Sequence, residues 1–186
     1  MFLVSLIFGL LACSSPADLI VDTGQETVST PDCASIAGMQ ICDFPAIDES
    51  GGDVKLSSLY SRPIVLDLSA MWCGPCKAAG ANTQETANIL GGEVTILTVL
   101  IENEYGEPPT AEDLVRWKET YNIVSEPVWG SSRDILTNNP IELSGKLFLE
   151  GWPTFYFIDA DGILQEYVKG YNEGQIIQQA ELLLIE

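Results

Sequence analysis

Hydrophobic and polar positions along the chain fall into short apolar runs and amphipathic stretches. The two longest runs after the N-terminal leader, residues 64–68 and 94–101, have the length of strands. The first run has one acid, Asp67, inside it, and apolar runs of this kind are typical of strands buried on both faces. The pattern predicts a helix over residues 75–90, which a pair of glycines ends, and another over residues 111–121, where apolar residues recur at helical spacing.

The remaining pattern predicts hairpins at both ends of the folded part. A glycine-rich turn within residues 44–56 indicates an N-terminal hairpin, followed by one helical turn at residues 57–60. Strands are expected at residues 154–158 and 163–168, and a closing amphipathic helix at residues 173–185. Residues 123–150 hold only short pieces and turn signals. Strand–helix alternation followed by a hairpin and a helix predicts a mixed central sheet covered on both faces.

Composition narrows the classes of function. The chain has 186 residues, 46% of them hydrophobic, which suits one domain with appendages. Its formal net charge of −19 argues against nucleic-acid binding, which needs clustered Lys and Arg. The absence of histidine excludes Ser-His-Asp and Cys-His catalysis and zinc sites that contain histidine. Five cysteines remain as the candidate reactive groups.

The first residues predict that the protein is located in the cell envelope. Residues 1–12 are almost wholly apolar, too few to span a bilayer but of signal-peptide length. The boundary Leu10-Leu11-Ala12-Cys13 resembles a bacterial lipobox, in which the cysteine is lipidated and anchors the mature chain to a membrane. Ser14 then favours the outer membrane. The alternative is an uncleaved leader with an incidental cysteine.

These features predict three segments. Residues 1–12 would be the signal peptide, residues 13–35 a lipid-anchored flexible tether rich in polar residues, and residues 36–186 the folded domain. The domain would face the periplasm.

The central motif is Trp72-Cys73-Gly74-Pro75-Cys76-Lys77, directly after the run at residues 64–68. Two cysteines separated by two residues at a helix start can close a small disulfide. The first thiol would face the positive end of the helix dipole, which stabilises the reactive thiolate. Pro75 suits the first helical turn, where its missing N–H is not needed.

This motif resembles the active site of thioredoxins. The frame from Phe44 to Lys77, together with residues 151–162, resembles the TlpA-like membrane-anchored thiol–disulfide oxidoreductases, and the resemblance covers residues 43–185. It implies a thioredoxin-like three-layer α/β fold, with a mixed central sheet, helices on both faces and an N-terminal β-hairpin.

The resemblance also implies roles for particular residues. Cys73 would be the nucleophile and Cys76 the buried resolving thiol. Asp67 would be a buried acid of raised pKa that relays the proton of Cys76, and Pro153 the cis-proline beside the disulfide. Residues expected to contact substrate are Trp72, Gly74, Pro75, Trp152 and Thr154. Trp72 could instead serve only core packing, and Trp152 is larger than the residue common before this proline.

Cys33 and Cys42 complete the cysteine count. In an oxidising compartment they are expected to form a structural disulfide, although a second redox couple is an alternative. A Cys₄ zinc site with Cys73 and Cys76 is disfavoured, because the first pair lacks the spacing of a zinc knuckle. The segment Asp159-Ala160-Asp161-Gly162, which contains two acidic residues, is interpreted as a turn and not as a calcium loop. No metal or cofactor is expected.

The sequence therefore predicts a periplasmic thiol–disulfide oxidoreductase that reduces protein disulfides. Its partners would be those substrate proteins, a membrane or periplasmic electron donor, and the membrane through lipidated Cys13. Two alternatives remain open. A thiol peroxidase shares the wider fold but needs a Pro-x-x-x-Thr-x-x-Cys signature that the chain lacks, and a Cu(I) metallochaperone would need a third ligand such as Met71.

Overall fold

The computed structural model describes residues 33–143 and 145–185. The expected signal peptide at residues 1–12, the lipid-bearing Cys13 and most of the expected tether lie outside these described residues. No helix in the described part of the chain is long and apolar enough to cross a membrane.

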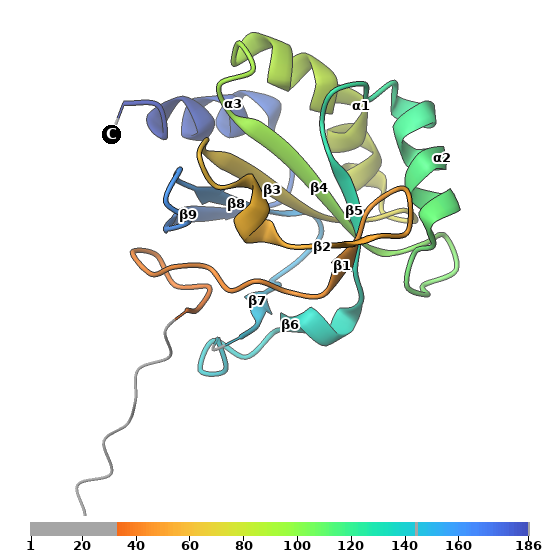
Figure 1. Ribbon diagram of the computed structural model, residues 1–186, viewed down its shortest axis with the longest axis horizontal. Helices are drawn as coiled ribbons and strands as arrows, with labels where there is room; N and C mark the ends of the chain where they lie inside the picture. Colours follow the sequence, from red (N-terminus) through yellow and green to blue (C-terminus); the bar gives the residue numbers. More distant parts are fainter. Residues whose placement is uncertain (1–32, 144, 186) are drawn as a thin grey trace, which may run out of the picture. The chain divides into compact units, whose positions relative to one another are not determined.

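Seven strands form one mixed sheet in the order β2-β1-β5-β4-β3-β8-β9 (Figure 1). Strands β3, β4 and β5 are parallel neighbours, and every other pairing in this sheet is antiparallel. The mixed sheet and its N-terminal hairpin confirm the prediction. The strands are β1 (Ala46–Ile47), β2 (Asp53–Val54), β3 (Ile64–Ala70), β4 (Thr95–Glu102), β5 (Val128–Gly130), β8 (Thr154–Ile158) and β9 (Leu164–Lys169).

Within the described residues, three α-helices and two 3₁₀ turns connect the strands. Their bounds are α1 (Gly74–Ile89), α2 (Ala111–Tyr121), α3 (Glu173–Leu182), η1 (Leu56–Leu59) and η2 (Arg133–Ile135). Strands β6 (Leu136–Thr137) and β7 (Leu147–Phe148) pair with each other in a small second sheet. The α-helices lie within a few residues of their predicted positions, with α3 ending three residues early. Residues 123–150, for which the pattern predicted no clear elements, contain β5, η2, β6 and β7.

The ends of α2 explain why its prediction was accurate. Thr110 and Asp113 form a capping box, in which each side chain satisfies a backbone N–H of the other. Asn122 ends the helix in the left-handed conformation with φ 52°. Leu114 and Trp117 are buried as the apolar stripe predicts, whereas Val115 is exposed, since it points away from the sheet.

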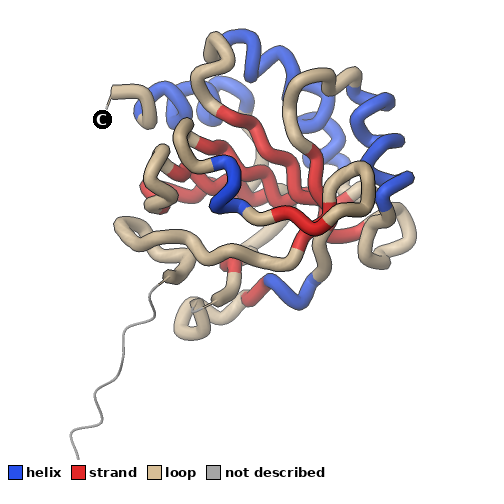
Figure 2. The backbone as a smooth tube through the Cα atoms, in the orientation of Figure 1, coloured by secondary structure: helices blue, strands red, loops and turns tan. Residues whose placement is uncertain are grey.

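All three α-helices cover one face of the sheet (Figures 1 and 2). Strands β3, β4 and β5 follow one another in a single direction across the sheet, and right-handed crossovers in one direction place both connecting helices on the same side. The expectation of helices on both faces therefore holds only through the 3₁₀ turns η1 and η2, which contribute Leu56 and Ile135 to the other face.

The N-terminal segment covers that other face. Ile41, Phe44 and Ala46 pack there against apolar side chains of the central strands, such as Leu66 and Leu97. Side chains alternate across a strand, so the residues of β3 divide between this cluster and the helical face. A central sheet covered on both sides by apolar side chains makes one continuous domain core.

The folded part begins earlier than predicted. Ala34 is fully buried, and its N–H donates to the Gln40 carbonyl oxygen at 2.9 Å. Cys33 and Cys42 are joined by a disulfide with Cα atoms 5.0 Å apart. The predicted end of the tether, at residue 35, is therefore too late in the chain. Residues 33–35 belong to the folded part, because the disulfide and hydrogen bonds hold them there.

Candidate active site

The candidate site lies at one edge of the central sheet. Cys73 follows the carboxyl end of β3, and Glu102 stands at the carboxyl end of β4, its parallel neighbour. Arg133 follows the carboxyl end of β5, and Trp152 precedes the start of the antiparallel strand β8. In open sheets with parallel strands, functional groups gather at this edge because the carboxyl ends meet there.

Cys73 and Cys76 form a disulfide at the start of α1, with Cα atoms 5.2 Å apart. Cys73 is the N-cap residue, and its sulfur accepts a hydrogen bond from the backbone N–H of Cys76 at 3.2 Å. When the bridge is reduced, this N–H and the helix dipole favour a thiolate at Cys73. Cys76 is fully buried, whereas Cys73 keeps 4% of its surface exposed. The first sulfur is thus the more accessible of the two.

Asp67 lies in the middle of β3 and is 1% exposed. It shares the helical face of the sheet with Val65, which packs against α1, the helix that carries Cys76. Burial raises the pKa of Asp67 to about 7, and a hydrogen bond from Ser69 opposes this rise. Its second oxygen, Oδ2, is buried without a hydrogen-bond partner. A carboxyl group near its pKa with a free oxygen can exchange a proton near neutral pH.

Two tryptophans flank the disulfide in space. Trp72 precedes Cys73, and Trp152 precedes Pro153 through a cis peptide bond. Their rings meet edge to face, with centroids 6.0 Å apart and planes at 78°. Trp72 is 44% exposed, so its side chain is available for contact with a substrate and is not simply part of the core. Trp152 is half-buried and Pro153 is buried.

The other residues expected to contact substrate differ in exposure. Gly74 and Pro75, in the first turn of α1, are exposed. Thr154 is fully buried, and its hydroxyl donates to the Gly151 carbonyl oxygen at 2.7 Å. The Thr154 side chain therefore stabilises the turn before β8, and the expectation that it contacts substrate is wrong for that side chain.

The sequence pattern did not predict three polar residues of the site: Ser69, Glu102 and Arg133. Ser69 could have been found, because it lies two residues after Asp67 on the same face of one strand. Glu102, at the end of the neighbouring parallel strand, carried a weaker signal. Arg133 carried none, since it lies 60 residues after Cys73 in a segment without periodicity.

The second cysteine pair and the acidic turn stand apart from this site. Cys33 and Cys42 are bonded to each other, which contradicts a shared Cys₄ zinc site. Asp159 caps its own turn, because its Oδ1 accepts the N–H groups of Asp161 and Ile163, each at 2.9 Å. Within the described ranges, no three His, Cys, Asp or Glu side chains cluster as metal ligands.

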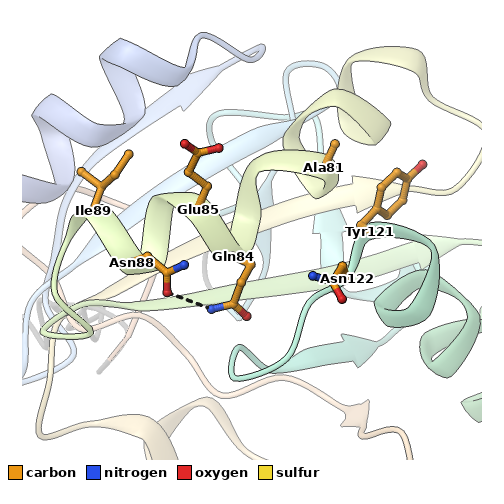
Figure 3. A pocket seen from close by; sticks show the side chains of 7 residues that line it. All are labelled: Ala81, Gln84, Glu85, Asn88, Ile89, Tyr121 and Asn122. Carbon is orange, nitrogen blue, oxygen red and sulfur yellow. Dashed lines mark hydrogen bonds between the residues drawn. The ribbon is translucent and has the colours of Figure 1, made fainter.

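A surface pocket of about 620 Å³ lies at the opposite end of α1 (Figure 3). Gln84 crosses it to accept hydrogen bonds from the N–H groups of Val124 and Ser125, at 2.7 Å and 3.0 Å. Asn88, a lining residue, lies twelve residues after Cys76, which is about 18 Å along the helix. The pocket therefore extends along the second half of α1, away from the helix start that carries the cysteines, and neither cysteine lines it. Its lining residues are Ala81, Gln84, Glu85, Asn88, Ile89, Tyr121 and Asn122.

Solved structures share this fold. An exposed lipoprotein thioredoxin from Streptococcus pneumoniae is 25% identical, with a TM-score of 0.55 over 76% of this chain and 99% of that one. A secreted Mycobacterium tuberculosis disulfide oxidoreductase homologous to E. coli DsbE is 17% identical, with a TM-score of 0.54 over 75% and 95% of the two chains. The second likeness, at this low identity, shows the fold alone.

Sequence comparison gives the family. The mitochondrial thioredoxin of Bos taurus is 30% identical over 81 residues, which are 43% of this chain and 49% of the relative. The sequence model of the AhpC/TSA family matches residues 37–167, a range that includes both active-site cysteines and Pro153. The family match, the fold and the cysteine pair at the start of α1 identify the chain as a member of the AhpC/TSA family and a thiol–disulfide oxidoreductase of thioredoxin fold.

Proposed function

We propose that this oxidoreductase reduces disulfides in proteins of the bacterial cell envelope. The observation that carries the proposal is the placement of Cys73 at the N-cap of α1, bonded to buried Cys76 on a helix that packs against the face of the sheet where Asp67 is buried. A Gly-Pro pair between the cysteines, as in reducing thioredoxins, favours the reducing direction.

The reaction begins with the reduced dithiol. The Cys73 thiolate attacks one sulfur of the substrate disulfide, a mixed disulfide forms, and the other substrate sulfur leaves as a thiolate. Cys76 then transfers its proton to Asp67 and attacks the Cys73 sulfur, so the second substrate sulfur leaves. The substrate gains two electrons, the Cys73–Cys76 disulfide forms, and an electron donor of the envelope reduces it again.

A trapping experiment tests this sequence. Reduced Cys76→Ser protein should accumulate mixed disulfides between Cys73 and envelope proteins, whereas Cys73→Ser protein should accumulate none. The wild-type protein should also reduce the disulfides of insulin when a dithiol regenerates it. Failure of insulin reduction together with failure of trapping would contradict the proposed function.

The family name makes peroxidase activity the main alternative. In peroxidases of the wider fold, the reactive cysteine follows a Thr by three residues and a Pro by seven, but Ala70 and Leu66 stand at those places before Cys73. A thiol peroxidase would consume hydrogen peroxide with Cys73 as its reactive residue. We expect peroxide consumption no faster than that of an unrelated dithiol, measured beside insulin reduction.

A Cu(I) metallochaperone is the second alternative, and Met71 would be its nearest additional soft ligand. Met71 is 2% exposed and packs in the same apolar cluster as Cys73 and Cys76. Cu(I) titration of the reduced protein, compared with its Met71→Leu variant, separates this alternative, since a chaperone would bind one equivalent and lose affinity in the variant.

Location in the envelope rests on Cys13 and on the relatives, which include a secreted and a lipoprotein member of the fold. The mature protein would carry lipid on Cys13 and sit on the outer membrane, facing the periplasm. The Cys13→Ser variant should move from the membrane to the soluble fraction. Mature protein that keeps Met1 and lacks an acyl mass would contradict this proposal.

A further inference from the structure

Four side chains form a closed ring of contacts at the active edge, the edge of the central sheet where the candidate site lies. They are Trp72, Glu102, Arg133 and Trp152. Trp72 Nε1 donates to Glu102 Oε2 at 2.7 Å, and Arg133 Nε donates to Glu102 Oε1. The Arg133 guanidinium carbon lies 5.8 Å from the centre of the Trp152 ring, and Trp152 meets Trp72 edge to face. The ring joins the two residues that immediately precede Cys73 and Pro153.

This ring of four side chains depends on the ion pair between Glu102, which is buried, and Arg133, which is exposed. The Glu102 side chain is only 7% exposed, whereas that of Arg133 is 60% exposed. The hydrogen bond from Arg133 is the main cause that lowers the pKa of Glu102, so the carboxylate stays ionised. A buried carboxylate needs a charged partner, and a guanidinium can bind it while its flat face stacks over an aromatic ring.

We propose that Arg133 is a positioning residue that holds Trp152 against Trp72 and thereby shapes the surface on which a polypeptide substrate lies beside the active-site disulfide. This inference rests on the proposed function. In the described part of the chain, the Trp152 ring has one aromatic contact, Trp72, and one cation–π contact, Arg133, beside its apolar packing against the core. Without Arg133 the indole loses its cation–π contact and keeps only Trp72 and its apolar packing against the core.

The surface continues past Arg133 into a cavity of about 400 Å³. Arg133 itself lines this cavity, and Leu136 and Leu149 supply its apolar part. Trp152 packs against the same core cluster as these two leucines, and Arg133 both lines the cavity and contacts the Trp152 ring, so Arg133 links the cavity to the tryptophan pair. The cavity is completed by Thr137 and Asn138.

This arrangement separates two classes of substrate. A polypeptide that carries a disulfide can lay a neighbouring side chain in the cavity while its sulfur meets Cys73. A small disulfide that ends within a few atoms of its sulfurs reaches only the cysteines and Trp72. Arg133 should therefore matter for the KM of protein substrates and not for the reactivity of the thiols.

The test compares Arg133→Ala with wild type on two substrates, insulin and the small neutral bis(2-hydroxyethyl) disulfide. We expect KM for insulin to rise about three- to tenfold, as loss of a cation–π contact and its stacked geometry implies, with kcat changed less than twofold. The rate with the small disulfide should stay within twofold of wild type. Arg133→Lys keeps the ion pair but not the planar stacking, so its KM should lie between the two.

Arg116→Ala is the matched control. Arg116 is also ion-paired with carboxylates, Glu104 and Asp113, and its side chain is 51% exposed, but among the described residues the cation–π contact to Trp152 comes from Arg133 and not from Arg116. Its KM for insulin should equal that of wild type. The near-ultraviolet circular dichroism of the tryptophans should change in Arg133→Ala and not in Arg116→Ala.

The outcomes are distinguishable. If Arg133→Ala unfolds because Glu102 is left unpaired, the double variant Arg133→Ala/Glu102→Gln removes that charge, and the same rise in KM is expected. An unchanged KM for insulin, or an equal loss with the small disulfide, would overturn the role of Arg133 while the proposed function stands. If the wild type reduces the small disulfide but not insulin, the proposed function fails and the role of Arg133 fails with it.

Discussion

Ser69 donates a hydrogen bond from its hydroxyl to Oδ1 of Asp67 at 2.7 Å, and both side chains are buried in β3. The bond occupies one carboxylate oxygen and leaves Oδ2 without a partner. Oδ2 is therefore the oxygen available to accept a proton, which in the proposed reaction comes from Cys76. Ser69 also stabilises the ionised form of Asp67, which opposes the effect of burial on its pKa.

Asp67→Asn should slow the resolving step and leave the first attack almost unchanged. An amide of similar size cannot accept the proton of Cys76, whereas Cys73 is activated by the start of α1. We expect the mixed disulfide to persist at least about 100-fold longer at pH 7, the lower end of what a positioned general base contributes. Stopped-flow mixing of reduced protein with a model disulfide measures both steps. A slower first step with normal resolution would contradict this assignment.

Ser69→Ala should raise the pKa of Asp67, because it removes the hydrogen bond that stabilises the carboxylate. The midpoint of the pH dependence of resolution should then move to higher pH than in the wild type. Tyr171 is the titratable neighbour to exclude: burial chiefly raises its pKa, with a smaller contribution from carboxylates that include Asp67, so it stays neutral in this range. Ser69→Thr keeps the hydroxyl and should restore the wild-type midpoint. A midpoint unchanged in Ser69→Ala would show that this hydrogen bond does not act on the acid.

The stability of the oxidised protein should depend on pH through Asp67. Its pKa rises from 3.8 to about 7 on folding, so between these values the unfolded chain loses the proton while the folded chain keeps it. The contribution of Asp67 to the free energy of unfolding is therefore most favourable below pH 4, and it falls as the pH rises to 7. The full loss is about 4 kcal/mol.

Urea unfolding of wild type and Asp67→Asn at several pH values isolates this effect, because the other carboxylates are common to both proteins. The variant should gain stability relative to wild type from pH 4 to pH 7 and keep a constant advantage above it. A stability difference that does not change with pH would mean that Asp67 titrates near its ordinary value when folded.

The Cys33–Cys42 disulfide should stabilise the fold without serving the reaction. The bridge closes a short loop, and removing it through Cys33→Ser/Cys42→Ser should cost about 2–3 kcal/mol in free energy of unfolding. Insulin reduction at a temperature where the variant is folded should match wild type. A large loss of turnover under those conditions would instead support a second redox couple.

Local pattern predicted most of the elements correctly. The two buried strands β3 and β4 are predominantly apolar runs, and α1 and α2 have start and end signals within their own sequences. The cysteines, Asp67 and Pro153 could be found because the cysteines and Asp67 lie within ten residues of each other and Pro153 lies in a second recognisable motif. Such signals involve residues close in sequence, where periodicity and capping operate.

Residue order alone is therefore enough to specify the redox motif, the acid six residues before it and the alternation of strands and helices. The tertiary structure alone decided that all three α-helices share one face, because that follows from the order of strands in the sheet and not from any one segment. It alone decided that Arg133, 60 residues from Cys73, joins Glu102 and Trp152 at the active edge. Contacts between separate strand ends depend on which strands become neighbours, and no local pattern in the chain encodes that choice.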